Sequence, residues 1–194
     1  MSKKKLHPAS RNDLEALIAQ ARHYATHMME TTGSVPPSLM AITPDGVMLF
    51  VPSGMGNDQA KDKFANAGRL VAVGYRATAV AMILESWATF AKRPGQPLPD
   101  VPPSQSPYRE EVVVIMGETR ETRAQQFLFI QRNSSGKFTG FGTSLVPQFD
   151  QMEGRFAQML PPKVPTEQNA VMARTLLGAM GVEVTNHGSR PLWN

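Results

Sequence analysis

The chain has 194 residues, 41% hydrophobic and 19% charged, so it can bury the core of one domain of ordinary size. It has no cysteine, which excludes disulfides, cysteine-ligated metal sites and a thiol nucleophile within this chain. The net charge is +4, but Lys3, Lys4 and Lys5 supply three of these charges, and residues 98–194 hold nine basic and nine acidic side chains. This balance argues against a broad positive face in that half of the chain.

The N-terminal lysines do not precede the apolar stretch of a secretory signal. Arg11, Asp13 and Glu15 follow them instead, so we expect a cytoplasmic protein. The longest apolar stretch, 77–91, is interrupted by Glu85 and is shorter than the about 20 residues that a membrane-spanning helix needs. We therefore expect no membrane role.

The chain up to residue 73 predicts a helix, a hairpin and a second helix. Apolar residues at helical spacing predict an amphipathic helix over 11–32, capped by Ser10 with Asp13 and ended by Gly33. The expected strands 39–43 and 47–51 flank Pro44-Asp45-Gly46, a turn whose glycine can take a positive φ. The same helical spacing recurs over 57–73.

The middle of the chain leaves one alternative open. Residues 79–91 fit either a strand or a buried helix, because periodicity cannot separate the two in so apolar a run. Six prolines between 93 and 107 then exclude regular structure and predict an extended surface crossing or a lid.

The second half predicts a three-stranded meander and two helices. The strands are expected at 111–116, 126–131 and 137–145, and apolar residues on both sides of the first predict a strand covered on both faces. Helices are expected at 150–160 and 166–180. The sequence therefore predicts an α+β fold: a basic flexible tail at 1–10 and a single domain at 11–194, with a mainly antiparallel sheet and about four helices.

Glu85 is the most conspicuous ionisable residue, because it lies in the apolar run 80–88. A buried carboxylate needs a partner or stays protonated, and Arg109 is the nearest candidate after the proline-rich segment. In the structural interpretation this pair fixes the proline-rich segment to the sheet. In the functional one, Glu85 and Arg109 are catalytic candidates in a cleft that Trp87, Ser106 and Glu110 line.

These residues form part of a longer pattern. Glu85-Ser86-Trp87, then Pro103-Ser104-x-x-Pro107-x-Arg109-Glu110-Glu111 before a strand, resembles a pattern in uncharacterised small proteins of bacteria and their phages. The resemblance covers residues 80–116. It implies a phage or mobile-element context and no established activity.

Two other motifs suggest ligands only weakly. His23, His27 and Glu30 lie on one side of the first helix, but Tyr24 stands where a zincin needs its glutamate, so we expect no metal. Gly54-Met55-Gly56 precedes a helix as a phosphate loop does, but it lacks the third glycine or the Lys-Ser/Thr of known loops. Asp58 and Asp62 would repel a phosphate there.

Two motifs in the meander favour structural roles. Phe138 and Phe141 are three residues apart, so in a regular strand they would lie on opposite faces, and core packing is the better interpretation. The tandem Glu-Thr-Arg triplets at 118–123 predict a solvated hairpin tip.

The leading hypothesis is an accessory protein that acts through protein contacts, including self-association, without catalysis or a cofactor. Its basis is the two-sided apolar strands, the 12 methionines and the lack of an intact catalytic signature. Two alternatives stay open: a hydrolase-like enzyme centred on Glu85 and Arg109, and a nucleic-acid-binding protein. The nucleic-acid alternative would use the basic residues Lys3, Lys4, Lys5, Arg11, Lys61, Lys63, Arg69 and Arg76.

Overall fold

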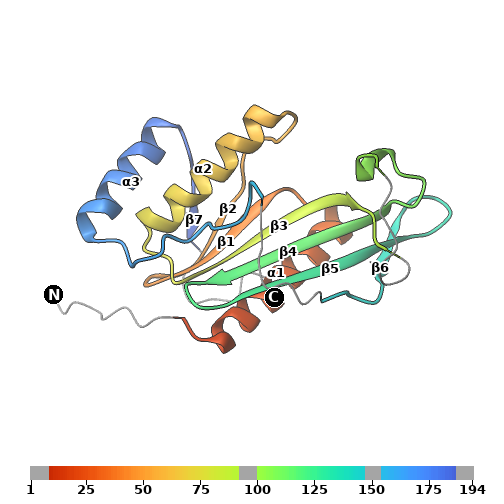
Figure 1. Cartoon of the computed structure of the whole chain (residues 1–194), viewed down its shortest axis with the longest axis horizontal. Coiled ribbons are helices and arrows are strands. Elements are labelled where there is room, and N and C mark those ends of the chain that lie inside the picture. The colour runs from red at the N-terminus through yellow and green to blue at the C-terminus, as the bar shows by residue number, and fades with distance from the viewer. Residues whose placement is uncertain (1–8, 92–99, 147–153, 187–194) are drawn as a thin grey trace.

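The structure is a computed structural model, and it describes residues 9–91, 100–146 and 154–186. Among these, three α-helices and seven strands follow one another along the chain (Figure 1). The helices are α1 (Arg11–Thr32), α2 (Asp58–Gly74) and α3 (Glu167–Ala179). The strands are β1 (Ser38–Thr43), β2 (Gly46–Phe50), β3 (Ala79–Ala88), β4 (Glu110–Thr119), β5 (Arg123–Arg132), β6 (Phe138–Phe141) and β7 (Thr185–Asn186).

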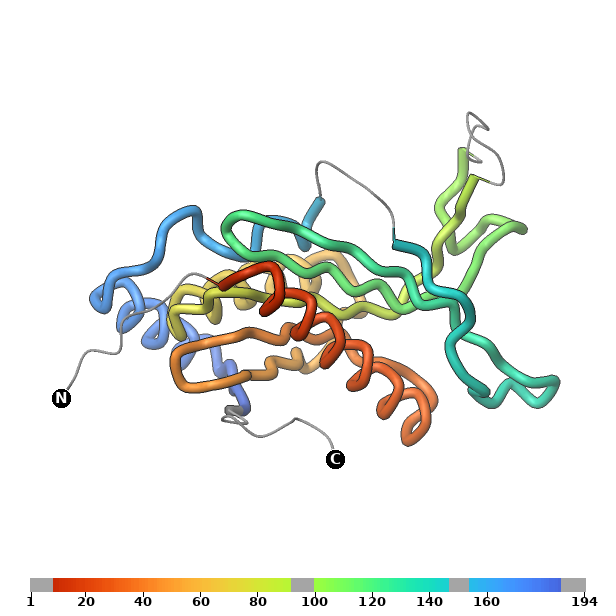
Figure 2. The backbone as a smooth tube through the Cα atoms, turned by 90° about the horizontal axis from the view of Figure 1, so that it is seen from below, coloured from red at the N-terminus to blue at the C-terminus, as the bar shows by residue number. Residues whose placement is uncertain are grey.

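The strands form one sheet in the order β6-β5-β4-β3-β1-β2-β7, and every neighbouring pair is antiparallel. Helix α1 covers one face, as Figure 2 shows from below, and α2 with α3 covers part of the other face. The α+β class and the mainly antiparallel sheet are therefore confirmed. No helix in the described ranges is long and apolar enough to cross a bilayer.

Helix α1 begins and ends where the sequence predicts. Ser10 and Asp13 form the reciprocal capping box, and Gly33 ends the helix at φ 78°, a left-handed conformation that suits glycine. One side of the helix buries apolar residues against the sheet. These residues are Leu14, Leu17, Ala21, Tyr24, Ala25 and Met29.

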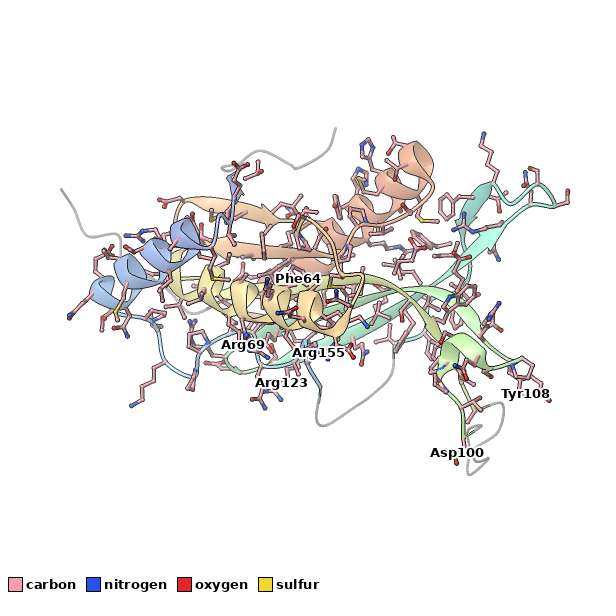
Figure 3. The ribbon with its side chains drawn as sticks, turned by 90° about the horizontal axis from the view of Figure 1, so that it is seen from above. Phe64, Arg69, Asp100, Tyr108, Arg123 and Arg155 are labelled. Atoms are coloured by element: carbon pink, nitrogen blue, oxygen red, sulfur yellow. The ribbon has the colours of Figure 1, made fainter. Side chains whose placement is uncertain are left out.

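Helix α2 packs on the opposite face around an aromatic residue. Phe64 is 2% exposed, and its ring centroid lies 5.4 Å from that of Phe50 and 5.9 Å from that of Phe156 (Figure 3). Helix α3 packs on α2 through Ala173 and Leu177. The two helices therefore lie side by side on this face, with α2 packed on the strands.

Residues 79–88 form a strand, which settles the alternative that the sequence leaves open. β3 pairs with β1 on one side and β4 on the other, so its backbone groups are satisfied by the two neighbours. Its alternate residues pack on the two faces: Ala79, Ala81 and Ile83 with α1, and Val80 with Met82 towards α2. A strand that is buried on both faces needs no polar alternation, which explains the uniformly apolar sequence.

The predicted helix at 150–160 is wrong where the structure describes it. Residues 154–160 form turns and bends, with Gly154 at φ 113° and Gln158 at φ 55°, both outside the helical region. Phe156 and Met159 pack in the α2-side core from this irregular segment. The described residues thus contain three helices rather than about four, and residues 150–153 lie outside the described ranges.

Two expectations for the meander need correction. Phe138 and Phe141 do not lie on opposite faces, since their ring centroids are 5.1 Å apart and both rings pack on the α1-side core. The strand is irregular here: its register with β5 shifts between Gln131 and Arg132, and Gly140 takes φ 148°. Core packing of the two rings is confirmed.

The hairpin tip between β4 and β5 is less solvated than the sequence predicts. Glu118 is 4% exposed and accepts a hydrogen bond from the backbone N–H of Leu160 (2.5 Å). Arg120 donates to the carbonyl of Ala77 (3.0 Å), and burial lowers the pKa of Arg120. The tip therefore binds the backbone of two other segments, at Leu160 and at Ala77.

The proline-rich segment is described only in part. Residues 93–99 of the predicted crossing lie outside the described ranges, and Pro103–Gln105 forms one turn of 3₁₀ helix before β4. This turn contacts β3 and positions Arg109 beside it.

Candidate functional site

Glu85 lies on the α1 face of β3, opposite Val113 of β4. Its partner is the backbone N–H of Val35, which donates to Oε2 of Glu85 at 2.7 Å. Val35 is 3% exposed and belongs to the link between α1 and β1. Glu85 therefore ties this link to the sheet, and the partner that the sequence predicts, Arg109, is not the group it binds.

A second carboxylate, Glu111 on β4, binds Arg132 at the end of β5. The guanidinium donates from Nε to Oε2 (2.9 Å) and from Nη2 to Oε1 (2.7 Å), which is the two-bond geometry that arginine favours. The hydrogen bond to Glu111 raises the pKa of Arg132, and the negative charge of Glu85 adds to this effect.

Arg132 also binds two backbone carbonyls. It donates to Gly33 at the end of α1 (3.4 Å from Nη2) and to Gly136 in the turn before β6 (3.3 Å from Nη1). Together, Glu85, Glu111 and Arg132 hold the end of α1 on the sheet. The sequence gives no local signal for this network, because its members are far apart in the chain.

Arg109 packs on the ring of Trp87 instead of binding Glu85. Its guanidinium carbon lies 4.6 Å from the centroid of the Trp87 ring, and its Nη1 donates to the carbonyl of Ser104 (2.5 Å). Trp87 is 41% exposed. The pair therefore closes the proline-rich segment onto β3 through a cation–π contact rather than through an ion pair.

The remaining residues of the predicted cleft do not face one space. Ser106 is 2% exposed, and its hydroxyl accepts from the backbone N–H of Tyr108 (3.1 Å) within the turn. Glu110 is exposed and alternates with Glu111, so it points to the other face of the sheet. A cavity of about 380 Å³ at this end of the sheet is lined by Arg132 and not by Glu85 or Arg109.

The three metal candidates on α1 do not form a cluster. His23 and Glu30 are exposed and His27 is half-buried on the helix surface. In the described ranges, no group of three histidine or acidic side chains is arranged to hold a metal ion.

The loop with Gly54 and Gly56 ends at an ordinary helix cap. Asn57 accepts from the backbone N–H of Ala60 (2.8 Å) through its side chain. Asp58 and Asp62, which the sequence suggests would repel an anion, bind Arg155 at 3.1 and 2.8 Å. Lys61 also binds Asp58 (3.3 Å), so Arg155 and Lys61 together balance the two negative charges.

Four of the five basic residues of the nucleic-acid alternative that the structure describes are bound within the chain. Arg11 pairs with Glu15 (3.0 Å) and Lys61 with Asp58 (3.3 Å). Arg69 donates to three carbonyls of the segment 154–158, and Arg76 pairs with Glu167 (3.4 Å). Lys63 has no hydrogen bond or ion pair to any described residue, and Lys3, Lys4 and Lys5 lie outside the described ranges.

The structure also reveals an apolar surface that the sequence analysis missed. We define the α3 face as the solvent-exposed apolar residues of α3 and its end: Val171, Met172, Leu176 and Met180. They are between 47% and 59% exposed. Their spacing is helical, and a sequence pattern alone cannot tell a second exposed apolar side from a helix that is buried all round.

Comparison of the chain with models of known protein families, with curated proteins and with solved structures found no match in any of the three. The site is therefore interpreted from its own geometry.

Proposed function

We propose that this chain is a non-catalytic accessory protein that acts through protein contacts, and that the α3 face joins two copies of it. The observation that carries the proposal is the exposure of four large apolar side chains on one helix. Contiguous exposed apolar residues are uncommon on monomeric proteins and mark contact surfaces. A phage or mobile-element context and a cytoplasmic location remain part of this proposal.

The charges of α3 favour a second copy as the occupant. Between residues 166 and 182 the only charged side chains are Glu167 and Arg174, and these bind each other at 3.1 Å. Two copies of a chain with net charge +4 repel one another, so they associate best through a neutral apolar patch.

The spacing of the α3 face suits a symmetric contact. Met172, Leu176 and Met180 are four residues apart, so they form one stripe along the helix. Two such stripes can pack antiparallel about a two-fold axis, in which each copy presents the same residues. The methionines can adjust their side chains to the partner.

The geometry favours neither alternative function. Glu85 uses a carboxylate oxygen to hold a backbone amide, and Arg109 lies on Trp87, so these residues are not assembled around one cavity in the described ranges. The cations of α2 mostly bind carboxylates or carbonyls of the same chain.

The test is the oligomeric state of Leu176→Glu, measured by light scattering after size exclusion. A carboxylate at the centre of the α3 face should convert the dimer to a monomer, because it would be buried in the contact without a partner. Val146→Glu is the matched control, since Val146 is 62% exposed and lies outside α3. Dimers of equal stability in both variants would refute the α3 contact.

A further inference from the structure

We propose that the cavity between α2, the end of β2 and the link from α3 to β7 binds a small monocarboxylate with an apolar body. The carboxylate would bind the ammonium group of Lys63 at the mouth, and the apolar body would fill the interior. This inference concerns a ligand rather than a second copy, and Met180 is the residue of the α3 face that also lines the cavity.

The cavity has the size and the lining of a ligand site. Its volume is about 470 Å³, within the range of roughly 300 to 1,000 Å³ typical of small-molecule pockets. Its inner wall includes Phe50, Phe64 and Ala67, each no more than 3% exposed. Such a wall favours an alkyl or aryl group, because burying it removes apolar surface from water.

Lys63 supplies a cation that the fold itself does not use. It is exposed, lines the cavity, and makes no hydrogen bond or ion pair with any residue in the described part of the chain. Lys61, two residues earlier on the same helix, binds Asp58. An unpaired ammonium beside an apolar cavity is complementary to a carboxylate attached to an apolar group.

The other charges around the mouth indicate a ligand with a single negative charge. Asp58 and Asp62, on the same helix, are balanced by Arg155 and Lys61. Glu183 lines the cavity from the link between α3 and β7, and no ion pair joins it to Lys63. The mouth therefore offers one cation, Lys63, and one carboxylate, Glu183. A phosphate group with two negative charges requires several hydrogen-bond donors, and this mouth does not supply them.

Two probes with the same alkyl chain separate the charge from the apolar body. Octanoate and octylammonium should be titrated into the full chain, with binding followed by the amide resonances of α2 and of residues 180–183. Octanoate should give saturable shifts at these residues, and octylammonium should bind more weakly, because its charge repels Lys63.

Three variants locate the site. Lys63→Gln should weaken octanoate binding by about tenfold, as expected for the loss of one charge-assisted hydrogen bond. Glu183→Gln should strengthen it, since a nearby negative charge is removed. Lys61→Gln is the matched control and should leave binding unchanged, because Lys61 is absent from the lining.

A variant that fills the cavity tests whether the apolar body of the ligand binds in its interior. Ala60→Phe places a ring in the space that Ala60 lines and should abolish binding of both probes. If that variant does not fold, Lys63→Gln still decides the matter, because its side chain is exposed. The proposal is overturned if octanoate gives no saturable shift at the cavity, or if Lys63→Gln binds it as tightly as the wild-type chain.

Discussion

Glu85 holds the link between α1 and β1 through an oxygen atom, so its role in the fold requires an acceptor more than a charge. Glu85→Ala leaves the buried N–H of Val35 without its acceptor and should lower the free energy of unfolding by about 1 to 3 kcal/mol. Glu85→Gln keeps an acceptor oxygen and should cost much less. Urea unfolding of the two variants measures the difference.

The exposed neighbour Glu110 provides the control for Glu85, since Glu110→Ala should change the unfolding free energy only slightly. Equal losses in Glu85→Ala and Glu85→Gln would contradict the account. In that case the negative charge of Glu85, acting on Arg132, would account for its contribution to the free energy of unfolding.

Ionisation of the buried Tyr24 should destabilise the fold at alkaline pH. Its hydroxyl lies 3.0 Å from Oγ of Ser38, in a hydrogen bond in which either hydroxyl can be the donor. Burial raises the pKa of Tyr24, and the hydrogen bond to Ser38 opposes the effect only in part.

The sign of the Tyr24 effect follows from proton binding. The folded state holds the phenol proton more tightly than the unfolded state, so this stabilisation is complete below the unfolded pKa of about 10 and is lost as the pH rises through the folded pKa. The unfolding free energy of the wild-type chain should therefore fall more steeply than that of Tyr24→Phe above about pH 10. Parallel pH profiles from urea titrations would show that Tyr24 does not titrate in this way.

At the scale of the elements, Gly117 sets the distance between α1 and β4. A Cβ atom at this position would lie 2.9 Å from Cδ1 of Leu14 and 3.0 Å from Cδ1 of Ile18. Gly117→Ala should therefore lower the unfolding free energy by about 1 to 3 kcal/mol through overpacking. Thermal and urea unfolding give this value directly.

Gly178 in α3 is the matched glycine control. Nothing lies within 4 Å of a Cβ at this position, so Gly178→Ala should stabilise the chain by about 0.5 to 1 kcal/mol through helix propensity. Changes of the same sign in the two variants would argue against the close packing of α1 on β4.

Arg69 fixes the irregular segment 154–160 on α2. It donates to the carbonyls of Arg155 (2.9 Å), Ala157 (3.1 Å) and Gln158 (3.4 Å). Arg69→Met removes these donors but keeps an apolar stem, so amide exchange in 154–160 should accelerate about tenfold, equivalent to about 1.4 kcal/mol.

Arg123 is the control for the Arg69 experiment. It is the first residue of β5, and it makes no hydrogen bond or ion pair with the described residues. Arg123→Met should leave exchange in 154–160 unchanged. An equal acceleration in both variants would mean that the segment responds to charge in general rather than to the Arg69 contacts.

The elements with strong local signals were predictable. The helix 11–32, the hairpin around Asp45-Gly46 and the meander carry caps, turn residues and periodicity that act over a few residues. The segment 154–160 was not, because Gly154, Gln158 and the contacts with Arg69 depend on the position of α2. Local propensity is a weak guide where tertiary contacts decide the conformation.

The candidate site was predicted only in outline. The sequence indicates that Glu85 needs a partner, but it cannot place the N–H of Val35, which is 50 residues away in the chain, within hydrogen-bonding distance. Arg132 was missed for the same reason, since its contacts with Glu111 and Gly33 exist only once the sheet has formed. The roles of Glu85 and Arg132 follow from where the folded chain places them, and residue type alone does not reveal them.

At the scale of the whole molecule, the two faces of the sheet differ. One is covered by α1 and held by the network of Glu85, Glu111 and Arg132, while the other carries α2, α3 and the cavity beside Lys63. The α3 face belongs to this second side, and its apolar residues are exposed to solvent. The residues on the α1 side therefore have structural roles, and we expect contacts with other molecules on the α3 side.

The most direct test of this assignment is sedimentation equilibrium of the wild-type chain over a hundredfold range of concentration. We expect a reversible equilibrium between one and two copies, because the α3 face is apolar and the charged residues of α3, Glu167 and Arg174, bind each other. A single monomeric mass at every concentration would contradict the central claim that the α3 face joins two copies.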